Sequence, residues 1–372
     1  MPRELVAVAP RTPVIREYEE QPLGPRQIRI RTEFASPKHG TELVGYRNDP
    51  VANRPYENHW GMTFPRPAEE GLKGFPRPLG NMAVGVVSER GPEASRFRVG
   101  DRVFGHFPIR ETQTAEETNA DLLPDGLSPQ GAVCLDPTVM SFALRDGGIK
   151  LGDRVAVFGL GALGLVAVQL ARLAGAAQVV AVDPLANRRA LALAFGADAA
   201  LDPTAGDGDA GKAIRLLTGA APDTSAPRPR QRVTGGYWEQ PTQTANLGVD
   251  VAVETSGNVL ALHQAIRATR FGGTVCLISF YGRDAAGLYL GDEFHVNRLN
   301  LVSVRAESLP MRDAPGWNLA RVVETCLAWL AEGRVRTDGI ITPIVPFAES
   351  ATAYRDIDEH PERSIKLGIT FG

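Results

Sequence analysis

Residues 155–164 have the sequence VAVFGLGALG, in which a short apolar run is followed by three glycines within six residues. Such a run indicates a buried strand, and the apolar residues beyond it indicate the first turns of a helix. Gly159 suits a tight turn, Gly161 lets a ligand approach the backbone, and Gly164 lets the helix pack on the strand. The segment therefore predicts a strand, a glycine turn and a helix whose N-terminal N–H groups can bind an anion.

An acidic residue follows at an informative spacing. The apolar run 178–182 predicts a second strand, which ends in Asp183. An acid about 20 positions after the last glycine of such a turn bonds the ribose 2′-hydroxyl of a dinucleotide. The pattern predicts a Rossmann unit, and the Asp183 carboxylate favours NAD over NADP because it repels a 2′-phosphate. The alternative is a glycine turn in another α/β protein, with Asp183 capping a helix before Pro184.

The expected cofactor-binding residues belong to the glycine turn and to the ends of the neighbouring strands. They are Gly159, Leu160, Gly161, Ala162, Leu163, Gly164, Asp183, Arg188, Ser256 and Ser279. Arg188 and Arg189 could soften the repulsion of a 2′-phosphate, but on a helix they are more typical of a solvated face.

The two halves of the chain differ in pattern. Residues 5–103 alternate apolar and polar side chains between frequent prolines and glycines, which indicates mostly β structure. After residue 150, short apolar strands alternate with helices, which predicts parallel βαβ units in a doubly wound sheet. The expected strands are 154–158, 178–182, 249–254, 274–279 and 299–304, and the expected helices are 163–174, 186–195 and 321–332. The Pro-rich stretch 219–247 is expected to be a mobile surface insertion, with an ordered lid as the alternative.

The length, composition and charge of the chain indicate which class of partner it binds. A chain of 372 residues predicts two domains, and 43% hydrophobic residues describe an ordinary globular protein. A formal net charge of −3 indicates no excess of basic residues that would attract nucleic acid or an anionic membrane, so we expect a small-molecule substrate. Three scattered cysteines suit buried free thiols in a reducing compartment, and the first 20 residues do not resemble a signal peptide. We expect a cytoplasmic protein.

With these parts in this order, the sequence resembles a medium-chain dehydrogenase/reductase of the zinc alcohol and polyol dehydrogenase branch. The likeness extends over essentially the whole chain, and its most specific parts are residues 85–87 (GVV), 100–103 (GDRV), the glycine turn, 253–257 (VETSG) and 272–275 (GGTV). The resemblance implies a GroES-like catalytic domain at residues 1–146, a Rossmann NAD-binding domain at 147–305 and a return to the catalytic domain at 306–372.

The metal-binding motifs of that branch are altered here. The cysteine of its Cys-Gly-Thr/Ser-Asp motif corresponds to His39, the histidine of its Gly-His-Glu motif to Asn81, and the acid of its Glu-Pro motif to Asp136. The stretch expected to carry the four-cysteine structural lobe, from about Gly105 up to Cys134, has no set of four cysteines. Zinc prefers thiolate, imidazole or carboxylate, and Asn81 is a weak ligand. We therefore expect no catalytic metal. The purely structural interpretation of His39 and Asp136 is that they form a hydrogen-bonded pair.

Another group must then exchange a proton with the substrate oxygen. The expected catalytic residues are His39, Thr41 and Asp136, with Thr41 at the position that the family gives to a proton-relay hydroxyl. Lys38 is a weaker candidate, because neighbouring side chains need not point the same way. The segment with His59 and Trp60 resembles the substrate-lining loop of the family.

The sequence thus predicts an NAD-dependent oxidoreductase that interconverts a secondary alcohol and a ketone, with a sugar, polyol or related hydroxy compound as substrate. One alternative is a zinc-independent quinone or enoyl reductase, although Asp183 disfavours the NADPH that these use. Another is a catalytically silent NAD-binding protein. The strand 299–304 ends the Rossmann sheet with an apolar edge, so we expect a homodimer or homotetramer.

Overall fold

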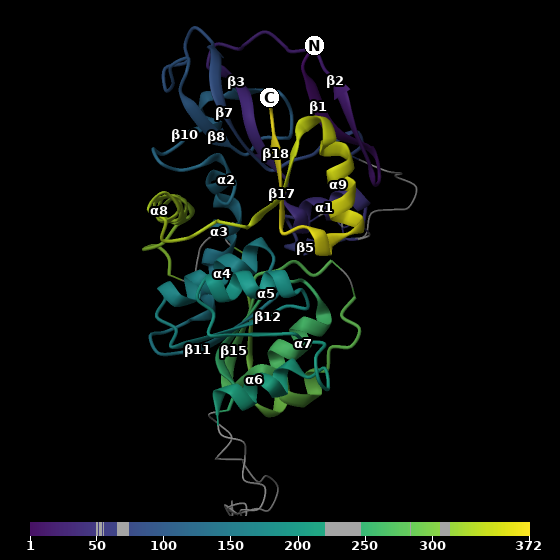
Figure 1. The fold of residues 1–372 in the computed structure, drawn as a ribbon, viewed down its shortest axis with the longest axis vertical. Helices are drawn as coiled ribbons and strands as arrows, with labels where there is room; N and C mark the ends of the chain where they lie inside the picture. Colours follow the sequence, from purple (N-terminus) through teal and green to yellow (C-terminus); the bar gives the residue numbers. More distant parts are fainter. Residues whose placement is uncertain are drawn as a thin grey trace, which may run out of the picture. The chain divides into compact units, whose positions relative to one another are not determined.

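The computed structural model describes residues 1–49, 51, 54, 56–64, 74–219, 247–282, 284–305 and 313–372. The chain divides into two compact units, of which the first contains residues 1–139, 282–284 and 320–372 and the second contains residues 140–281 and 285–319. Figure 1 shows the elements of both, coloured along the sequence. The predicted class is confirmed: the second unit has a parallel Rossmann-like sheet and the first is rich in β structure. The predicted boundaries at residues 146 and 306 stay predictions.

The second unit is built on a six-stranded parallel sheet. Its strands, in spatial order, are β13 (Ala199–Leu201), β12 (Gln178–Val182), β11 (Arg154–Phe158), β14 (Val249–Glu254), β15 (Thr269–Leu277) and β16 (Asn300–Ser303). Its helices are α4 (Ala162–Leu173), α5 (Ala186–Ala194), α6 (Ala210–Thr218) and α7 (Val259–Ala268). The strand order reverses between β11 and β14, and ligands of open α/β sheets bind at the carboxyl ends of the strands at such a point.

Most predicted elements of this unit begin and end within a residue of those observed. The strand β15 differs, because it begins at Thr269 instead of residue 274. Thr269 pairs with Val249 and Thr274 pairs with Val251, so the register shifts between the two pairs. Gly272 and Gly273, which precede the predicted strand, lie within this irregularity. Of the predicted 219–247 insertion, residues 220–246 lie outside the described residues.

The first unit contains a seven-stranded sheet and a three-stranded sheet. The larger has the order β10 (Asp121–Leu122), β8 (Arg102–Gly105), β7 (Met82–Arg90), β3 (Gln27–Ser36), β18 (Lys366–Thr370) and β17 (Ile341–Pro346), with β9 (Thr112–Glu116) also paired to β3. The smaller has the order β2 (Thr12–Glu17), β1 (Arg3–Ala9) and β6 (Arg77–Pro78), and β4 (Tyr56–Glu57) pairs with β5 (Met62–Thr63). The helices that contribute to this unit are α1 (His39–Arg47), α2 (Pro129–Ala132), α3 (Leu135–Phe142), α8 (Leu319–Ala331) and α9 (Ser350–Glu359).

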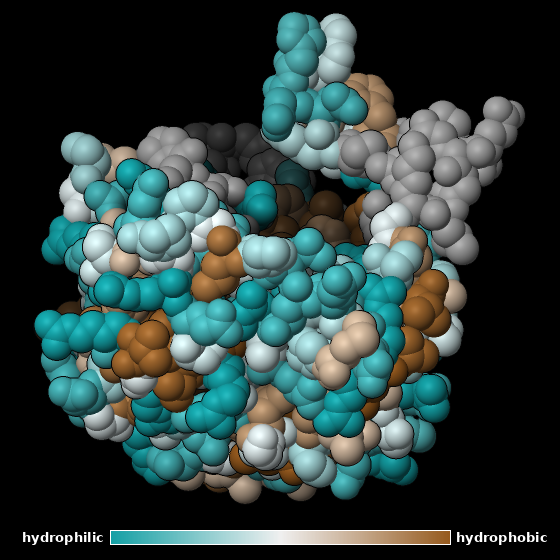
Figure 2. Space-filling view, turned by 90° about the horizontal axis from the view of Figure 1, so that it is seen from above, coloured by the Kyte–Doolittle hydropathy of each residue, from teal (hydrophilic) through white to brown (hydrophobic). Residues whose placement is uncertain are grey.

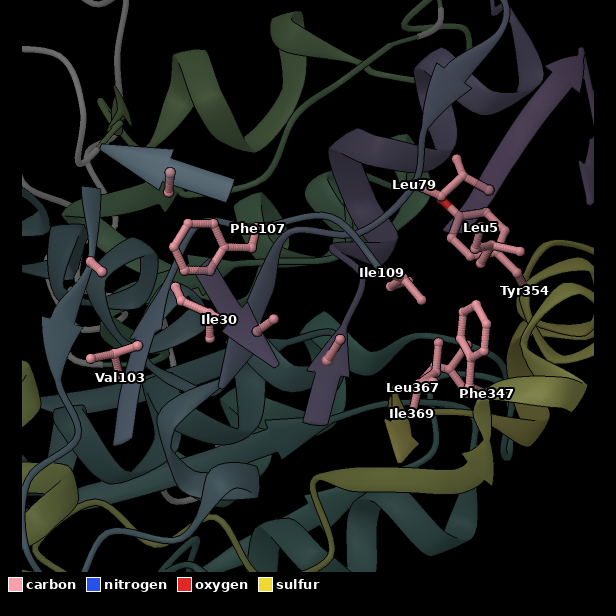
Figure 3. Close-up of a cluster of buried hydrophobic side chains, with 14 of the residues drawn as sticks. Leu5, Ile30, Leu79, Val103, Phe107, Ile109, Phe347, Tyr354, Leu367 and Ile369 are labelled. Carbon is pink, nitrogen blue, oxygen red and sulfur yellow. The ribbon is translucent and has the colours of Figure 1, made fainter. Parts of the chain in front are cut away.

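The C-terminal segment is part of the first unit's core. In Figure 1 the yellow β18 lies beside the purple β3, and the two strands pair antiparallel. Figure 3 shows the hydrophobic core that this pairing helps to form. Its members come from both ends of the chain and include Leu5, Ile30, Leu79, Tyr354 and Leu367, each at most 1% exposed.

The face in Figure 2 is mostly hydrophilic, with hydrophobic residues in small separate patches. Among the residues that the structure describes, no helix combines the length and apolarity needed to cross a bilayer.

The glycine turn after β11 packs as its sequence predicts. A Cβ at Gly164 would overlap the carbonyl oxygen of Gly159, whereas a Cβ at Gly161 would meet nothing within 4 Å. Gly161 has φ −70° and ψ −168°, which other residues also adopt. Gly164 is therefore needed for packing, and Gly161 is not.

We accordingly expect Gly164→Ala to lower the free energy of unfolding by about 1–3 kcal/mol, the usual cost of overpacking. Gly161→Ala is the matched control and should change it by less than about 1 kcal/mol. Urea unfolding followed by circular dichroism measures both. Equal destabilisation by the two substitutions would contradict this account of the turn.

Candidate functional site

In the second unit, the glycine turn lies directly against the segment that follows β14. Gly159 has φ +83°, and a Cβ there would lie 2.7 Å from Cβ of Ser256. The Thr255 hydroxyl donates to the carbonyl oxygen of Gly159 at 2.7 Å. The predicted residues of the turn and Ser256 are thus brought together at the carboxyl ends of β11 and β14, where the strand order reverses.

Asp183 also lies beside this turn. Its Oδ2 accepts the N–H of Leu160 at 2.7 Å and its Oδ1 accepts the N–H of Leu185 at 2.8 Å. The residue is 3% exposed, and a carboxylate oxygen can accept more than one hydrogen bond. Arg188 lies nearby, with Nη1 3.8 Å from Oδ2 of Asp183. The structure therefore places both the predicted acid and Arg188 at the end of β12.

Arg189 has a different role from the solvated face that the sequence suggests. Its side chain is 20% exposed and lies 3.1 Å from the carboxylate of Asp202. It also donates to the carbonyl oxygens of Asp183 and Pro184 at 2.8 and 2.7 Å. Arg189 therefore holds the backbone after β12.

A buried carboxylate that was not predicted from the sequence organises the segment that follows β14. Glu254, the last residue of β14, is fully buried. It accepts the backbone N–H of Ser256 at 2.8 Å and of Gly257 at 3.2 Å, and the hydroxyls of Ser256, Ser279 and Tyr281. Burial and the charge of Glu254 raise the pKa of Tyr281. The signal for this role was an acid that ends an apolar strand.

In the first unit, the side chain of Lys38 reaches the predicted catalytic acid. Lys38 Nζ lies 2.9 Å from Oδ1 of Asp136, at the start of α3. The two side chains are 20% and 5% exposed. Lys38, the weaker candidate in the sequence, is thus the residue that bonds Asp136.

The backbone around Lys38 is fixed by Glu42, one turn into α1. Glu42 accepts the N–H of Lys38 at 2.9 Å, the N–H of Gly80 at 2.6 Å and the hydroxyl of Tyr354 at 2.6 Å. Figure 3 shows the Tyr354 ring within the hydrophobic core. Burial raises the pKa of the Glu42 carboxyl, and these hydrogen bonds oppose that rise.

The C-terminal strand supplies two further contacts. Lys366 is 4% exposed, and its Nζ donates to the carbonyl oxygen of Pro37 at 2.8 Å. The N–H of Leu367 donates to Nε2 of His39 at 3.0 Å. His39 therefore carries its proton on Nδ1 when it is neutral. Burial lowers the pKa of Lys366, and the charge of Asp136 opposes that effect.

The other predicted residues lie in different surroundings. Thr41 is exposed in the first turn of α1. The backbone N–H of Asn81 donates to the carbonyl oxygen of Ser36 at 3.1 Å, and the buried side-chain Nδ2 of Asn81 has no hydrogen-bond partner among the described residues. His59 and Trp60 are exposed between β4 and β5, and their rings contact edge to face.

The donors at the positions of the family's zinc ligands do not make up a zinc site. Asp136 is bonded to an ammonium group, and Nε2 of His39 accepts a backbone N–H. Within the part of the chain that the structure describes, no group of three or more His, Cys, Asp or Glu residues could hold a metal. Cys134 is buried, and burial raises the pKa of its thiol to about 12.

Comparison with known proteins supplies the family. A family model described as a zinc-binding dehydrogenase matches residues 162–315. The D-guloside 3-dehydrogenase of Escherichia coli (strain K12) is 38% identical over 377 residues, which cover 99% of this chain and 100% of that protein. The (R,R)-butanediol dehydrogenase of Bacillus subtilis (strain 168) is 26% identical, with 73% of this chain and 75% of that protein covered.

A solved structure has the same fold. The crystal structure of 2R,3R-butanediol dehydrogenase from Bacillus subtilis matches with a TM-score of 0.71 and 21% identity, over 100% of this chain and 99% of that one. The match confirms the fold. Because a relative with 38% identity aligns along almost the whole chain, this protein belongs to the medium-chain dehydrogenase/reductase superfamily and is an alcohol dehydrogenase-like oxidoreductase.

Proposed function

We propose that the protein oxidises a secondary hydroxyl of a sugar or glycoside to a ketone with NAD, and catalyses the reverse reaction. The observation that carries this proposal is the 38% identity to a D-guloside 3-dehydrogenase along 99% of this chain. A match of that extent includes both units, and so includes the Lys38–Asp136 site as well as the glycine turn. The 3-hydroxyl of a glycoside is therefore our first candidate for the reacting group.

The second unit fits a dinucleotide. Gly161 leaves open space where a Cβ would stand, as close approach by a pyrophosphate requires. The helix α4 begins directly after it, and its N-cap residue makes no side-chain hydrogen bond to the first turn. Leu160, Ala162 and Leu163 would contribute backbone groups, and Asp183 would accept from the ribose. When bound, the oxidised nicotinamide supplies the hydride acceptor.

We infer that the reaction needs no zinc. The support is the donor chemistry, since an ammonium bonds the acid that corresponds to the third ligand. Asn81, at the second ligand position, is a poor zinc ligand. Our sequence-based assignment of His39 and Thr41 to proton transfer stays a prediction, as does the cytoplasmic location.

Two alternative functions can be compared with this proposal at specific residues. Quinone and enoyl reductases of this superfamily also lack zinc ligands, but they use NADPH, which the buried Asp183 carboxylate disfavours. A catalytically silent NAD-binding protein would have no need for an ordered ion pair at the position of the catalytic metal. The Lys38–Asp136 ion pair therefore argues against that function. A homodimer or homotetramer stays a prediction; it is compatible with β16, which lies at the edge of its sheet.

The cofactor prediction concerns Asp183. We expect NADH to bind at least about tenfold more tightly than NADPH, because a carboxylate repels a 2′-phosphate. Asp183→Ser should reduce this preference, whereas the control Asp207→Ser, at an exposed acid paired with Lys212, should leave it unchanged. Calorimetric titration of each protein with both cofactors measures the preference. Tighter binding of NADPH by the unsubstituted protein would assign control of the site to Arg188.

The substrate prediction concerns the position of oxidation. With NAD present, methyl glycosides of gulose and glucose should reduce the cofactor faster than simple alcohols, and quinones with NADPH should not react. A glycoside that carries deuterium at C3 should pass the label to NADH, which mass spectrometry detects. Glycosides labelled at C2 or C4 are the controls. Label transfer from C2 or C4 would keep the proposed reaction, oxidation of a secondary hydroxyl, but assign it to a different hydroxyl of the sugar. Faster reduction of quinones with NADPH would contradict the proposed reaction itself.

The metal prediction is tested without any substrate assumption. Elemental analysis of the purified protein should give far less than one zinc per chain, and prolonged chelation should leave the melting temperature unchanged. Stoichiometric zinc that chelator removes, together with a fall in melting temperature, would restore His39 and Asp136 as ligands.

A further inference from the structure

We propose that the amino group of Lys38, held by Asp136, exchanges the proton with the substrate hydroxyl and so takes the place of a catalytic metal. The inference rests on the proposed function and deepens it by naming the acid and base. It assigns a catalytic role to Lys38 and positioning roles to Asp136, Glu42 and Lys366. Each step depends on contacts within the first unit.

The first step is the position of the charge. In a metal-dependent enzyme of this kind a cation polarises the substrate oxygen. Here Nζ of Lys38 lies 2.9 Å from Asp136, the residue that corresponds to the third ligand. An ammonium at that place supplies positive charge and three N–H donors. The side chain of Lys38 is 20% exposed while that of Asp136 is 5% exposed, so a solute can reach the lysine and not the acid.

The second step is preorganisation. The N–H of Lys38 bonds Glu42, the preceding carbonyl oxygen of Pro37 bonds Lys366, and the following side chain of His39 bonds the N–H of Leu367. Three consecutive residues are therefore anchored to α1 and to β18. A group that is held in place before the substrate binds requires little reorganisation during the reaction.

The third step is the chemistry, which balances without a further reactant. In oxidation, the Lys38 ammonium first loses one proton to solvent, and the O–H bond of the substrate then breaks as its proton moves to the neutral amine of Lys38. The C–H bond of the same carbon breaks with its electron pair, which leaves as the hydride that oxidised dinucleotide accepts, and the C=O double bond forms. Asp136 stabilises the resulting ammonium. In reduction, that ammonium donates the proton to the oxygen as the hydride arrives.

A separate observation points to a hydroxylated ligand at this place. Asn81 is bonded through its backbone to Ser36, two residues before Lys38. Its Nδ2 is buried and has no hydrogen-bond partner among the described residues. Buried donors are nearly always paired in folded proteins, so this amide needs an acceptor that the described residues do not supply. A hydroxyl of a sugar next to the reacting one would provide it.

His39 is the rival for the catalytic role. Its Nε2 accepts the N–H of Leu367, so proton exchange through that nitrogen would require the bond to break. The geometry favours a positioning role for His39, in which the ring ties α1 to β18. The two residues can be separated by experiment, since their side chains support different kinds of rescue.

The central experiment compares Lys38→Ala with and without added primary amines. With the glycoside on which the natural protein is most active, we expect kcat to fall by roughly 10²–10⁴-fold while the affinity for NADH stays unchanged. Small primary amines should restore part of the rate, and the restored rate should increase with the basicity of amines of similar size. A residue with a merely structural role would not show this dependence.

Three variants serve as controls. Lys38→Arg keeps a cation beside Asp136, but the guanidinium cannot exchange its proton. This variant should therefore fold normally and lack activity. Lys212→Ala removes an exposed lysine that is also 2.7 Å from an aspartate, and it should keep full activity. Lys366→Ala should lower the melting temperature, and amines should not restore its activity.

Several outcomes would overturn the proposal. They are near-normal kcat in Lys38→Ala, rescue of Lys366→Ala but not of Lys38→Ala, and loss of kcat in His39→Ala that imidazole but not amines restores. Stoichiometric zinc that is lost in Asp136→Ala would also overturn it. Failure of the proposed function looks different, because the unsubstituted protein would then oxidise none of the glycosides. In that case, if Lys38→Ala binds glycosides as tightly as the natural protein by calorimetry, Lys38 has no contact with a substrate oxygen.

Discussion

The antiparallel pairing of β18 with β3 is the constraint on which the first unit depends. It joins residues more than 300 positions apart, and the Ser36 hydroxyl reinforces it by donating to the carbonyl oxygen of Leu367 at 2.7 Å. Without that pairing Lys366 would lie far from Pro37, and His39 would lose its backbone donor. The same pairing brings Leu367 and Ile369 into the core with Leu5 and Ile30. The packing of the core and two of the contacts beside Lys38, those of Pro37 and His39, therefore depend on this strand pairing.

The second unit was largely predictable from its sequence, because its signals are local. The strand 154–158, the glycine turn and Asp183 lie within one βαβ unit, and each has a physical reason for its residue type. The role of Gly164 follows from its packing against Gly159, as expected from the spacing alone. Only β15 was placed wrongly, because glycines normally end a strand and here they form an irregularity inside one. Local patterns predict local structure well.

The polar networks could not be predicted, because they join residues that are distant in the sequence. Glu254 collects donors from Ser256, Ser279 and Tyr281, and no spacing rule indicates that a glutamate at the end of a strand has this function. The Lys38–Asp136 pair joins residues 98 positions apart. The family resemblance drew attention to the altered ligand positions, but which neighbour reaches Asp136 depends on how α1 leaves β3. That direction is a property of the folded backbone.

The three cysteines have a consequence for how the folding of this chain can be followed. All three are buried and none forms a disulfide; Cys134 and Cys326 lie in the first unit and Cys276 in the second. Burial raises the pKa of the thiols of Cys134 and Cys326 to about 12, so neither is a nucleophile in the native state. An alkylating reagent can therefore modify a cysteine only after the surrounding unit has opened. Peptide mass spectrometry then identifies the cysteine that carries the adduct and so the unit that opened. The native cysteines therefore report local unfolding without any introduced label.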